Sequence, residues 1–509
     1  MLRIGLVLLT AAALALTAFA PQARAGKKDD TLRFASDLEA ENVDAYYNNV
    51  REGIVLARLI WDQLIWRNPV TGEYKGMLAK SWKWTNPTTI DVELRQGIKF
   101  HNGEPFDADD VVYTLNTVVD PASKVITPNN VNWIKSAEKR GPFAVRIHLK
   151  EPFPAALEYL AGPIPIYPNE YYKQAGPRGM GEKPVGTGPY RVTEVRPGKL
   201  VRMEKNPDYF KDSPQGQPSI GKIEFRPIPE QNTQFAELMA GGIDWIWRVP
   251  IDQMDNLGGQ PGLAVKSGET MRVGSLMFAA SGKIPDAPTN KQQVREAIAY
   301  AVNRVAIRDN LAGKAARIVH TPCFPEQFGC IDKGVRTFDY DPAKAKKLLA
   351  EAGYPNGFST DIYTYGARDR PYVEAIVGDL REVGIIANLK SLQYAAWRDE
   401  VRAGHAQLFF GSWGSFSIAD ISAFTGYYFR FGPDDTTRDP EVRDWLQTGD
   451  TSIDLDVRRT NYTKALKRIA ERMYWLPFFT YPTNYAFTAD LEFTPSVDEV
   501  PRFVNSRWK

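Results

Sequence analysis

Cysteine and histidine are scarce in this chain of 509 residues, which contains two cysteines and four histidines. The histidines lie in unrelated segments, and no G-x-S-x-G, H-E-x-x-H or other nucleophile motif occurs in its expected context. These absences count against an enzyme built on such motifs, and we expect no metal site and no cofactor. A secreted glycan hydrolase stays open on this ground, because a glycosidase needs only two carboxylates.

An excess of charge of one sign is also lacking. Lysine and arginine total 63 against 61 aspartates and glutamates, so the net charge is +2, and there is no long basic run. This balance does not favour a nucleic acid or an anionic membrane as a partner, and we expect a small or neutral ligand. The 12 tryptophans and 23 tyrosines would suit a pocket lined by ring faces, although most rings in a globular protein belong to its core.

Long apolar runs are confined to the first 25 residues. Arg3 precedes an apolar stretch that ends at Ala20, and the A-R-A at 23–25 matches a small-x-small cleavage site. A membrane anchor is the alternative, because about 17 apolar residues is near the lower limit for crossing a bilayer. The polar GKKDD that follows favours cleavage after Ala25, and no cysteine stands there to carry a lipid. We therefore expect a soluble, periplasmic monomer of two or three domains.

The two cysteines, Cys323 and Cys330, are separated by six residues in the segment HTPCFPEQFGC. In an oxidising compartment this spacing most simply closes a small disulfide loop. His320 lies close by in the sequence, but three candidate ligands without a fourth make a poor zinc site. We predict the disulfide.

The hydrophobic pattern changes between the two halves of the chain. Alternating segments such as TIDVELRQGIKF and KLVRMEKN indicate a β-rich first half. A helix over 107–119 interrupts it, with Asp107 as N-cap and Asp110 in capping-box position. In the second half, apolar spacing and capping residues predict one helix over 290–313 and another over 342–352.

After residue 357 the pattern alternates strand, helix, strand, helix, strand, as in TDIYTYG, PYVEAIVGDLREVG, IIANLKSL, AAWRDEVRAG and AQLFFGSW. This order is typical of a parallel sheet covered by helices, so we predict an α/β fold. Ligands of open α/β sheets bind beyond the carboxyl ends of the strands. We therefore expect 413–416 and 365–368 on one rim, with Trp413 offering a ring face and Gly414 and Ser415 offering hydrogen bonds. The alternative is that the chain simply leaves the strand at this point and that Trp413 belongs to the core.

Several long segments resemble a known family. The signature regions of the peptide/nickel class (family 5) of extracellular solute-binding proteins, which serve ABC importers, are matched by MLAKSWKWTNPTTIDVELRQGIKFHNGEPFDADDVVYTL and PVGTGPYRVTEVRPGKLVRMEKNPDYF. VREAIAYAVNR, FDYDPAKAKKLLAEAGYPNGF and LREVGIIANLKSLQYAAWRDEVRAG follow in the family's order. The resemblance covers essentially the whole chain after the signal segment. It implies a two-lobed periplasmic binding protein whose lobes close over a ligand.

The resemblance also implies a division of the chain, because the first lobe of this family is discontinuous and carries an extra subdomain. Carried onto this sequence, the second lobe takes about 273–484 and the extra subdomain about 69–184. The first lobe takes the remaining segments, about 26–68, 185–272 and 485–509.

This sequence departs from the peptide-binding members at one position. Those proteins usually carry an acidic residue three positions after the Trp that matches Trp413, and it pairs with the amino terminus of the peptide. Here the position is Phe416. Asp420 could either replace the missing acid or cap the following turn. Arg368 and Arg370, in the loop expected after TDIYTYG, are candidates for a ligand carboxylate or are solvated loop charges.

The remaining candidates for the cleft are aromatic. Trp245 and Trp247 alternate in GGIDWIWRVP and so share one face of a strand. Tyr46 and Tyr47 follow the first strand, and Tyr365 ends a later one. Each of these rings could belong to the core or to the cleft.

The function implied by the resemblance is capture of a solute for import. The protein would bind a peptide or peptide-like solute between its lobes and deliver it to the permease subunits of an ABC importer in the inner membrane, without catalysis. An opine, a sugar conjugate, glutathione or a metal complex is the alternative ligand.

Overall fold

The computed structural model describes residues 26–40, 42–48 and 50–509, without the side chains of Ala367 and Phe416. The predicted signal segment, 1–25, lies outside the described residues. In the part of the chain that is described, no helix is both long and apolar enough to cross a membrane.

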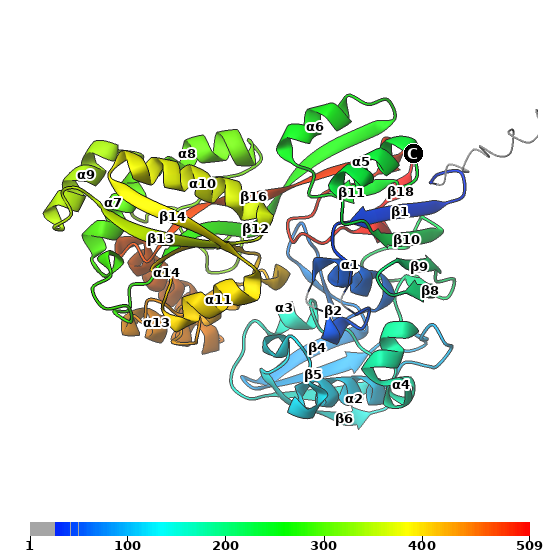
Figure 1. The fold of residues 1–509 in the computed structure, drawn as a ribbon. Helices are drawn as coiled ribbons and strands as arrows, with labels where there is room; N and C mark the ends of the chain where they lie inside the picture. Colours follow the sequence, from blue (N-terminus) through cyan, green and yellow to red (C-terminus); the bar gives the residue numbers. More distant parts are fainter. Residues whose placement is uncertain (1–25, 41, 49) are drawn as a thin grey trace, which may run out of the picture.

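One sheet of ten strands runs through the molecule (Figure 1). Its order is β14-β13-β15-β12-β16-β11-β1-β10-β9-β8. Near its middle, β12 and β16 pair antiparallel along much of their length and pass from one lobe into the other. The strands are β1 (Thr31–Ser36), β8 (Tyr190–Arg196), β9 (Leu200–Lys205), β10 (Lys222–Pro227), β11 (Trp245–Trp247), β12 (Leu263–Phe278), β13 (Phe358–Tyr365), β14 (Ile385–Leu392), β15 (Leu408–Trp413) and β16 (Trp475–Thr488).

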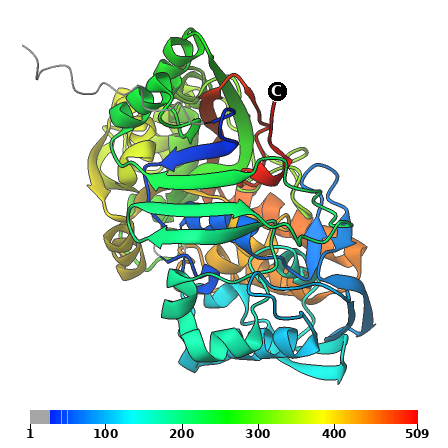
Figure 2. The ribbon, with the colours of Figure 1, turned by 90° about the vertical axis from the view of Figure 1, so that its right-hand side faces the viewer.

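The strands on either side of β12 and β16 form the two lobes. The first lobe holds β1 and β8 to β11, of which β1, β10, β9 and β8 lie side by side in Figure 2. Its helices are α1 (Arg51–Ile60), α5 (Gln231–Ala240) and α6 (Ile251–Gly258). The second lobe holds β13 to β15. Its helices are α7 (Gln292–Ala301), α8 (Arg304–Ile307), α9 (Pro342–Glu351), α10 (Gly366–Glu382), α11 (Tyr394–Ala403), α12 (Ser422–Tyr428), α13 (Pro440–Thr451) and α14 (Leu455–Glu471).

A separate antiparallel sheet of order β4-β5-β7-β6 adjoins the first lobe as an extra subdomain (Figure 1). The capping box predicted for α2 is confirmed, because Asp107 accepts a hydrogen bond from Asp109 N and Asp110 accepts one from Asp107 N. The elements are β4 (Ala79–Asn86), β5 (Thr89–Leu94), β6 (Ile134–Gly141), β7 (Ala144–Leu149), α2 (Ala108–Val119), α3 (Ala156–Leu160) and α4 (Asn169–Glu182). Two short ribbons pair β2 (Ile65–Arg67) with β3 (Tyr74–Gly76) and β17 (Leu491–Glu492) with β18 (Arg507–Trp508).

The predicted β-α-β-α-β pattern is confirmed in the second lobe. β13 pairs in parallel with β14 on one side and with β15 on the other, and α10 and α11 connect them. One boundary differs from the prediction: Arg368 and Arg370 lie in the first turns of α10 and not in a loop. Gly366 accounts for the difference, because its φ of 69° turns the chain directly from β13 into the helix.

The long helix predicted up to Gly313 is broken in two. α7 ends at Ala301, and Asn303 caps α8. The buried guanidinium of Arg304 donates to three backbone carbonyls inside the lobe, which requires the chain to turn just before it. Val305, an apolar residue within the predicted helix, is 52% exposed as a result. Burial of one arginine thus overrides the helical periodicity.

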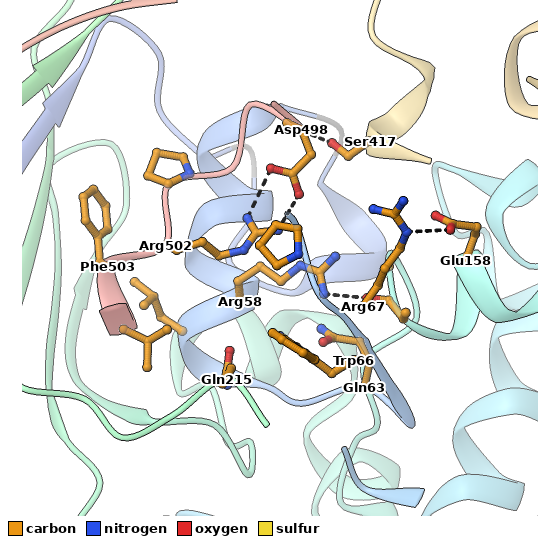
Figure 3. A pocket seen from close by; sticks show the side chains of 16 residues that line it. Arg58, Gln63, Trp66, Arg67, Glu158, Gln215, Ser417, Asp498, Arg502 and Phe503 are labelled. Carbon is orange, nitrogen blue, oxygen red and sulfur yellow. Dashed lines mark hydrogen bonds and ion pairs between the residues drawn. The ribbon is translucent and has the colours of Figure 1, made fainter. Parts of the chain in front are cut away.

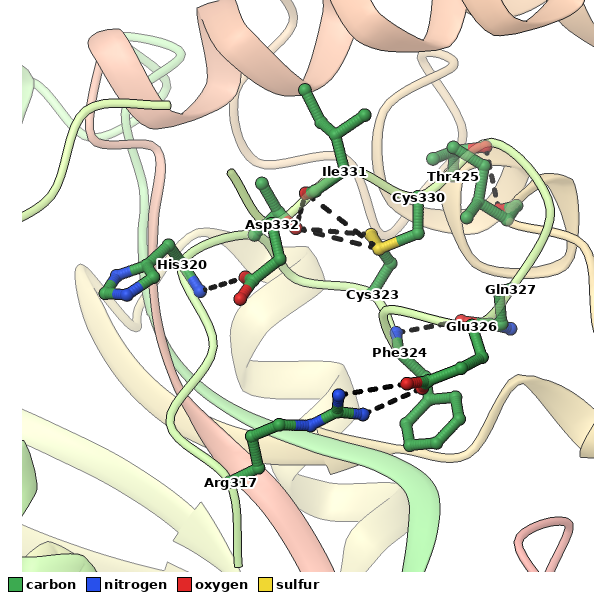
Figure 4. Close-up of a disulfide and its surroundings, with 12 residues drawn as sticks. Arg317, His320, Cys323, Phe324, Glu326, Gln327, Cys330, Ile331, Asp332 and Thr425 are labelled. Carbon is green, nitrogen blue, oxygen red and sulfur yellow. Dashed lines mark hydrogen bonds and ion pairs between the residues drawn. A yellow bond between two sulfur atoms is a disulfide. The ribbon is translucent and has the colours of Figure 1, made fainter. Parts of the chain in front are cut away.

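Cys323 and Cys330 form the predicted disulfide (Figure 4), with Cα atoms 5.9 Å apart. The closed loop supports the segment 418–421, which follows the end of β15. Phe328 exchanges two backbone hydrogen bonds with this segment, and the Gln327 side chain donates a third. The disulfide therefore braces the chain immediately beyond the predicted rim.

We predict that the native protein, denatured without reductant, yields no alkylated thiol at Cys323 or Cys330. Reduction should lower the free energy of unfolding by about 2 to 3 kcal/mol, because closing so short a loop removes little entropy from the unfolded chain. A denaturant titration with and without reductant measures the change. The double variant Cys323→Ser/Cys330→Ser is the control and should be insensitive to reductant. Two free thiols in the unreduced protein would contradict the pairing.

Candidate ligand-binding cleft

A cavity of about 560 Å³ opens between the lobes. Its lining comes from α1 and nearby residues of the first lobe, from segment 126–129 of the extra subdomain, and from the second lobe. Alternate side chains of β12 and β15 face it, because successive residues of a strand point to opposite sides of the sheet. These residues are Val273, Ser275 and Met277 on β12 and Phe409, Gly411 and Trp413 on β15.

Aromatic side chains form the wall that the second lobe gives to this cavity. Neighbouring ring centroids lie 4.7 to 5.9 Å apart, within the range of favourable aromatic contacts. Such a wall can stack on a planar group or cover a hydrocarbon chain. The rings belong to Tyr365, Tyr394, Trp397, Trp413, Phe424, Tyr427, Tyr428 and Trp475.

Two arginines share one carboxylate where α1, β12 and the C-terminal segment meet. Arg272 donates through Nε and Nη2 to the two oxygens of Glu499 (3.0 Å each), and Arg51 Nη2 donates to the same carboxylate (2.9 Å). Burial opposes ionisation of Glu499, but the charges of Arg272 and Arg51 outweigh it and hold the pKa of this carboxyl well below its usual value. These three residues, the Glu499 cluster, carry a net charge of +1.

A second group of the same composition stands in the second lobe. Arg402 donates to both oxygens of Asp434 at 2.7 Å, and Arg398 reaches the same oxygens at 3.4 Å. Burial opposes the charge of Asp434, yet the hydrogen bonds from Arg402 and Arg398 outweigh it, so the pKa of Asp434 is lowered. Arg398 and Asp434 line the cavity. These three residues, the Asp434 cluster, also carry a net charge of +1.

Arg248 adds a further guanidinium to the lining. It lies over the ring of Trp247, 4.4 Å from the centroid, and its Nη1 donates to Asp37 and Glu52 at 2.8 Å. Its backbone has a positive φ of 58°, a conformation that non-glycine residues seldom adopt outside sites that constrain them.

Three of the residues predicted for the site line the cavity: Trp413, Gly414 and Tyr365. A Cβ at Gly414 would lie 3.1 Å from Glu499 Oε2 and 3.2 Å from Arg272 Nη2, so a side chain there would press on the Glu499 cluster. The two predicted rim segments are brought together, because Tyr365 Oη donates to Ser412 O (3.0 Å).

Other predicted residues are not part of the cavity lining. Arg368 does not line the cavity; its Nη2 donates to Ser412 Oγ (2.7 Å), which lines it, and its guanidinium lies over the ring of Tyr481. Ser415 is 3% exposed and also lies outside the lining. Trp247 is buried and acts on the cleft through Arg248.

Tyr46 and Asp420 both point elsewhere. The Tyr46 hydroxyl donates to Pro165 O at 2.6 Å inside the first-lobe core. Asp420 is 3% exposed; it accepts hydrogen bonds from Arg458 Nη2 (2.8 Å) and from Ser422 N (3.0 Å), where the next helix begins. The Phe416 side chain lies outside the described part of the structure.

Sequence reasoning missed both arginine clusters. Their members are scattered from residue 51 to residue 499, and only Arg398 and Arg402 stand in one of the segments that resemble the family. In the sequence, nothing distinguishes Arg272 from other polar residues of an alternating strand. Likewise, nothing distinguishes Glu499 from other acidic residues near the end of the chain. No local signal could have found them, because the partners within each cluster come from segments that are distant in the sequence.

A second pocket, of about 40 Å³, lies beside the segment that follows β15 (Figure 3). Ser417 Oγ donates to Asp498 O (2.7 Å), and Glu158 binds both Arg67 Nε (2.8 Å) and Ala419 N (3.0 Å). These bonds join the extra subdomain and the C-terminal segment to the second lobe. The volume suits a few water molecules and not a solute. Across the described residues, no three His, Cys, Asp or Glu side chains gather to hold a metal ion.

We predict that Glu499→Gln lowers the free energy of unfolding by about 3 kcal/mol, because Arg51 and Arg272 lose a nearly buried counter-charge. The lowered pKa gives the sign of the pH dependence. The stability that Glu499 adds is complete above its ordinary pKa of 4.5 and is lost as the pH falls through the lower folded-state value. Glu499→Gln should therefore flatten the loss of stability below pH 4.5.

Urea titrations between pH 3 and pH 7 measure this effect. The matched control is Glu492→Gln, which removes an equivalent pair with Arg507 on the surface and should change stability little. Equal effects of the two substitutions would contradict the importance of the Glu499 cluster.

Comparison of the chain with known proteins identifies a family with this kind of fold. Residues 73–434 match the family model of the bacterial extracellular solute-binding proteins, family 5 Middle. The glutathione-binding protein GsiB of Escherichia coli (strain K12) is 33% identical over 293 residues, a match that spans 57% of this chain and 55% of the relative. The chain thus matches about half the length of this curated relative.

Solved structures show the same fold over nearly the whole chain. A dipeptide-binding protein from Pseudoalteromonas sp. SM9913, in complex with Met-Leu, is 22% identical with a TM-score of 0.79 and covers 94% of this chain and 100% of its own. AgaA from A. tumefaciens R10, in complex with agropinic acid, is 25% identical with a TM-score of 0.77 and covers 94% and 99%. The two-lobed α/β fold and the family predicted from the sequence are confirmed, and the chain belongs to the bacterial extracellular solute-binding proteins of family 5.

Proposed function

We propose that this protein is the periplasmic substrate-binding component of an ABC importer. It captures a small solute between its lobes and delivers it to permease subunits in the inner membrane. The observation that carries the proposal is one large cavity to which both lobes and the extra subdomain contribute. Because two strands join the lobes, a small change at those strands would open or close the cavity.

The strand pairing supports the proposed division of the chain. The boundary between 272 and 273 falls in β12 where its register with β16 shifts, between Glu269 and Ser275. The boundary between 484 and 485 falls within β16. Irregular pairing is weaker than a regular ladder, so we place the hinge in the stretch from Glu269 to Ser275. The first lobe then comprises 26–68, 185–272 and 485–509.

Exposed apolar residues at the cavity support closure over the ligand. Leu38 and Ile126 are each 45% exposed on the side of the first lobe and extra subdomain, and Tyr394 is 44% exposed on the side of the second lobe. Bringing these surfaces together removes apolar area from water, at roughly 25 cal/mol per Å². Ligand binding and burial of the rim would therefore reinforce each other.

The charges of the lining favour a ligand that carries a carboxylate. Four arginines and one carboxylate, that of Asp434, line the cavity among the described residues. Asp434 is already held by two arginines, and Asp420 is held by Arg458. Neither is placed to bind a ligand amine in this structure. We therefore favour a peptide-like or opine-like acid over a simple dipeptide bound by its free amine.

The names of the relatives fit this class without deciding the ligand. GsiB is named for glutathione, and AgaA is in complex with agropinic acid. Glutathione or an opine-like acid is thus a reasonable first candidate. Sugar conjugates and metal complexes remain alternatives from the sequence.

We also propose that the ligand leaves chemically unchanged. A glycoside hydrolase needs two carboxyl groups about 5 to 9.5 Å apart beside its substrate. Within the described lining of the cavity, Asp434 is the one carboxylate, and its lowered pKa makes it a poor proton donor. The secreted hydrolase alternative therefore gains no support from the site.

The proposal includes export and cleavage of the signal segment after Ala25. The Cys323–Cys330 disulfide supports an oxidising compartment. N-terminal sequencing of the protein from its native periplasm tests the cleavage site. We expect the mature protein to act as a monomer.

The experiment that tests the proposed function begins with the protein purified from its native periplasm, from which the bound compound is extracted and identified by mass spectrometry. Adding that compound back should raise the melting temperature, by an amount that corresponds to about 2.7 kcal/mol at one hundred times the dissociation constant. The compound should be recovered intact. Turnover that a single carboxylate substitution abolishes would instead support the hydrolase.

We predict that Trp413→Ala weakens binding of this compound by about 1 to 3 kcal/mol, because the ring supplies part of the aromatic wall. Calorimetric titration measures the loss. Trp508→Ala, which removes a partly exposed ring outside the cavity, is the matched control and should bind as the unchanged protein does. If Trp413→Ala binds the compound as tightly as the unchanged protein does, the aromatic wall does not contact the ligand as proposed.

A further inference from the structure

We propose that the ligand is a diacid, with one carboxylate bound at the Glu499 cluster and another at the Asp434 cluster. The inference rests on the proposed function and narrows its ligand class. It starts from the composition of the two clusters, each of which holds two arginines and one carboxylate. Each cluster therefore keeps one positive charge that its own carboxylate does not neutralise.

Within the Asp434 cluster, one arginine suffices to hold the carboxylate. Arg402 binds Asp434 at 2.7 Å through two nitrogens, while Arg398 stays at 3.4 Å, the outer limit of a hydrogen bond. The side chain of Arg398 is 35% exposed and lines the cavity. Arg398 is thus held loosely beside the space where a ligand carboxylate would bind it in bidentate fashion.

The Glu499 cluster offers a similar surplus. Arg51 and Arg272 both bind Glu499, and both line the cavity. The described bonds of Arg272 use Nε and Nη2, so Nη1 can bind a ligand without loss of the pair. Gly414 lies directly against this cluster and has no side chain to cover it.

The two clusters are separated along the floor of the cavity. Arg272 lies in the irregular stretch of β12. The segment that contains Asp434 lies near the C-terminal end of this strand, where Thr436 exchanges hydrogen bonds with Phe278 O (3.1 Å) and Ala280 N (2.9 Å). Six residues of strand span about 20 Å. Since arginine side chains are long, the anion-binding ends lie on the order of 10 to 20 Å apart.

The floor between the clusters is largely apolar, although Ser275 also faces the cavity there. Met277 and Gly411 face the cavity there, and the aromatic wall stands beside them. A Cβ at Gly411 would lie within 3.1 to 3.5 Å of Tyr365, Met277 and Trp397. Because glycine has no side chain, this part of the floor leaves more room for a ligand. The middle of the ligand should therefore be a hydrocarbon or planar segment without charge.

A ligand with a single carboxylate would leave one cluster unneutralised. Once the lobes close and exclude water, an uncompensated positive charge is costly because the surroundings polarise less. A second carboxylate removes this cost and adds its own bidentate contact. The two clusters together therefore favour a ligand with two carboxylates over a ligand with one.

The first test identifies what the cavity selects. The protein is unfolded in denaturant without reductant, refolded free of ligand, and mixed with the small-molecule fraction of cells of its host. The compound it retains is identified by mass spectrometry. We expect a compound with two separated carboxylates. A compound with one carboxylate, or none, would overturn the diacid inference and leave the importer function standing, whereas retention of nothing and no rise in melting temperature would overturn both.

The second test uses the retained compound as the probe on two variants. Arg272→Gln leaves Glu499 paired with Arg51, and Arg398→Gln leaves Asp434 paired with Arg402, so neither strands a buried carboxylate. Each should weaken binding roughly tenfold to hundredfold, the loss of one charge-assisted contact, and each ligand-free variant should still unfold cooperatively. Arg381→Gln, on an exposed turn of α10, is the matched control and should bind normally.

Esterifying one carboxylate of the compound at a time shows which carboxylate binds at which cluster. A monoester should bind more weakly to the unchanged protein and should lose its sensitivity to one of the two arginine substitutions while keeping its sensitivity to the other. If either Arg272→Gln or Arg398→Gln binds the free diacid as tightly as Arg381→Gln does, that cluster is not an anion site and the inference fails.

Discussion

β12 and β16 run antiparallel from one lobe into the other, and their pairing is irregular between Glu269 and Ser275. Arg272 stands in that irregular stretch, so its guanidinium meets Glu499 and Arg51 where the lobes join. The three residues come from a strand, the C-terminal segment and α1. Their ion pairs therefore tie α1 and the C-terminal segment to the crossing strands at the cleft.

The sequence predicted the local structure well wherever short-range chemistry decides it. The capping box at Asp107, the parallel β-α-β-α-β order and the Cys323–Cys330 disulfide follow from patterns within a few residues of each other, and all three are present. One failure has a tertiary cause: the helix up to Gly313 breaks because Arg304 is drawn into the lobe. The other is local: α10 starts early because the positive φ of Gly366 turns the chain directly from β13 into the helix.

The site was harder to predict than the fold. Trp413, Gly414 and Tyr365 could be placed at the cavity because strand ends share one edge of a sheet. Asp420 could not, since its partner Arg458 is distant in sequence and draws it away from the cleft. The arginine clusters combine residues from as many as three segments, so no single stretch of sequence carries their signal. Stacking surface was therefore visible in the sequence, and charge recognition was not.

The central claim is that a solute is held between lobes that move about the crossing strands. Spin labels on cysteines introduced at Lys124 and Asp399, exposed positions on either side of the cavity, report that movement directly. Pulsed electron–electron resonance gives their distance with and without the compound recovered from the native protein. The account predicts a shorter and narrower distance distribution in the presence of the compound. An unchanged distribution at saturating compound would contradict closure of the lobes over the ligand.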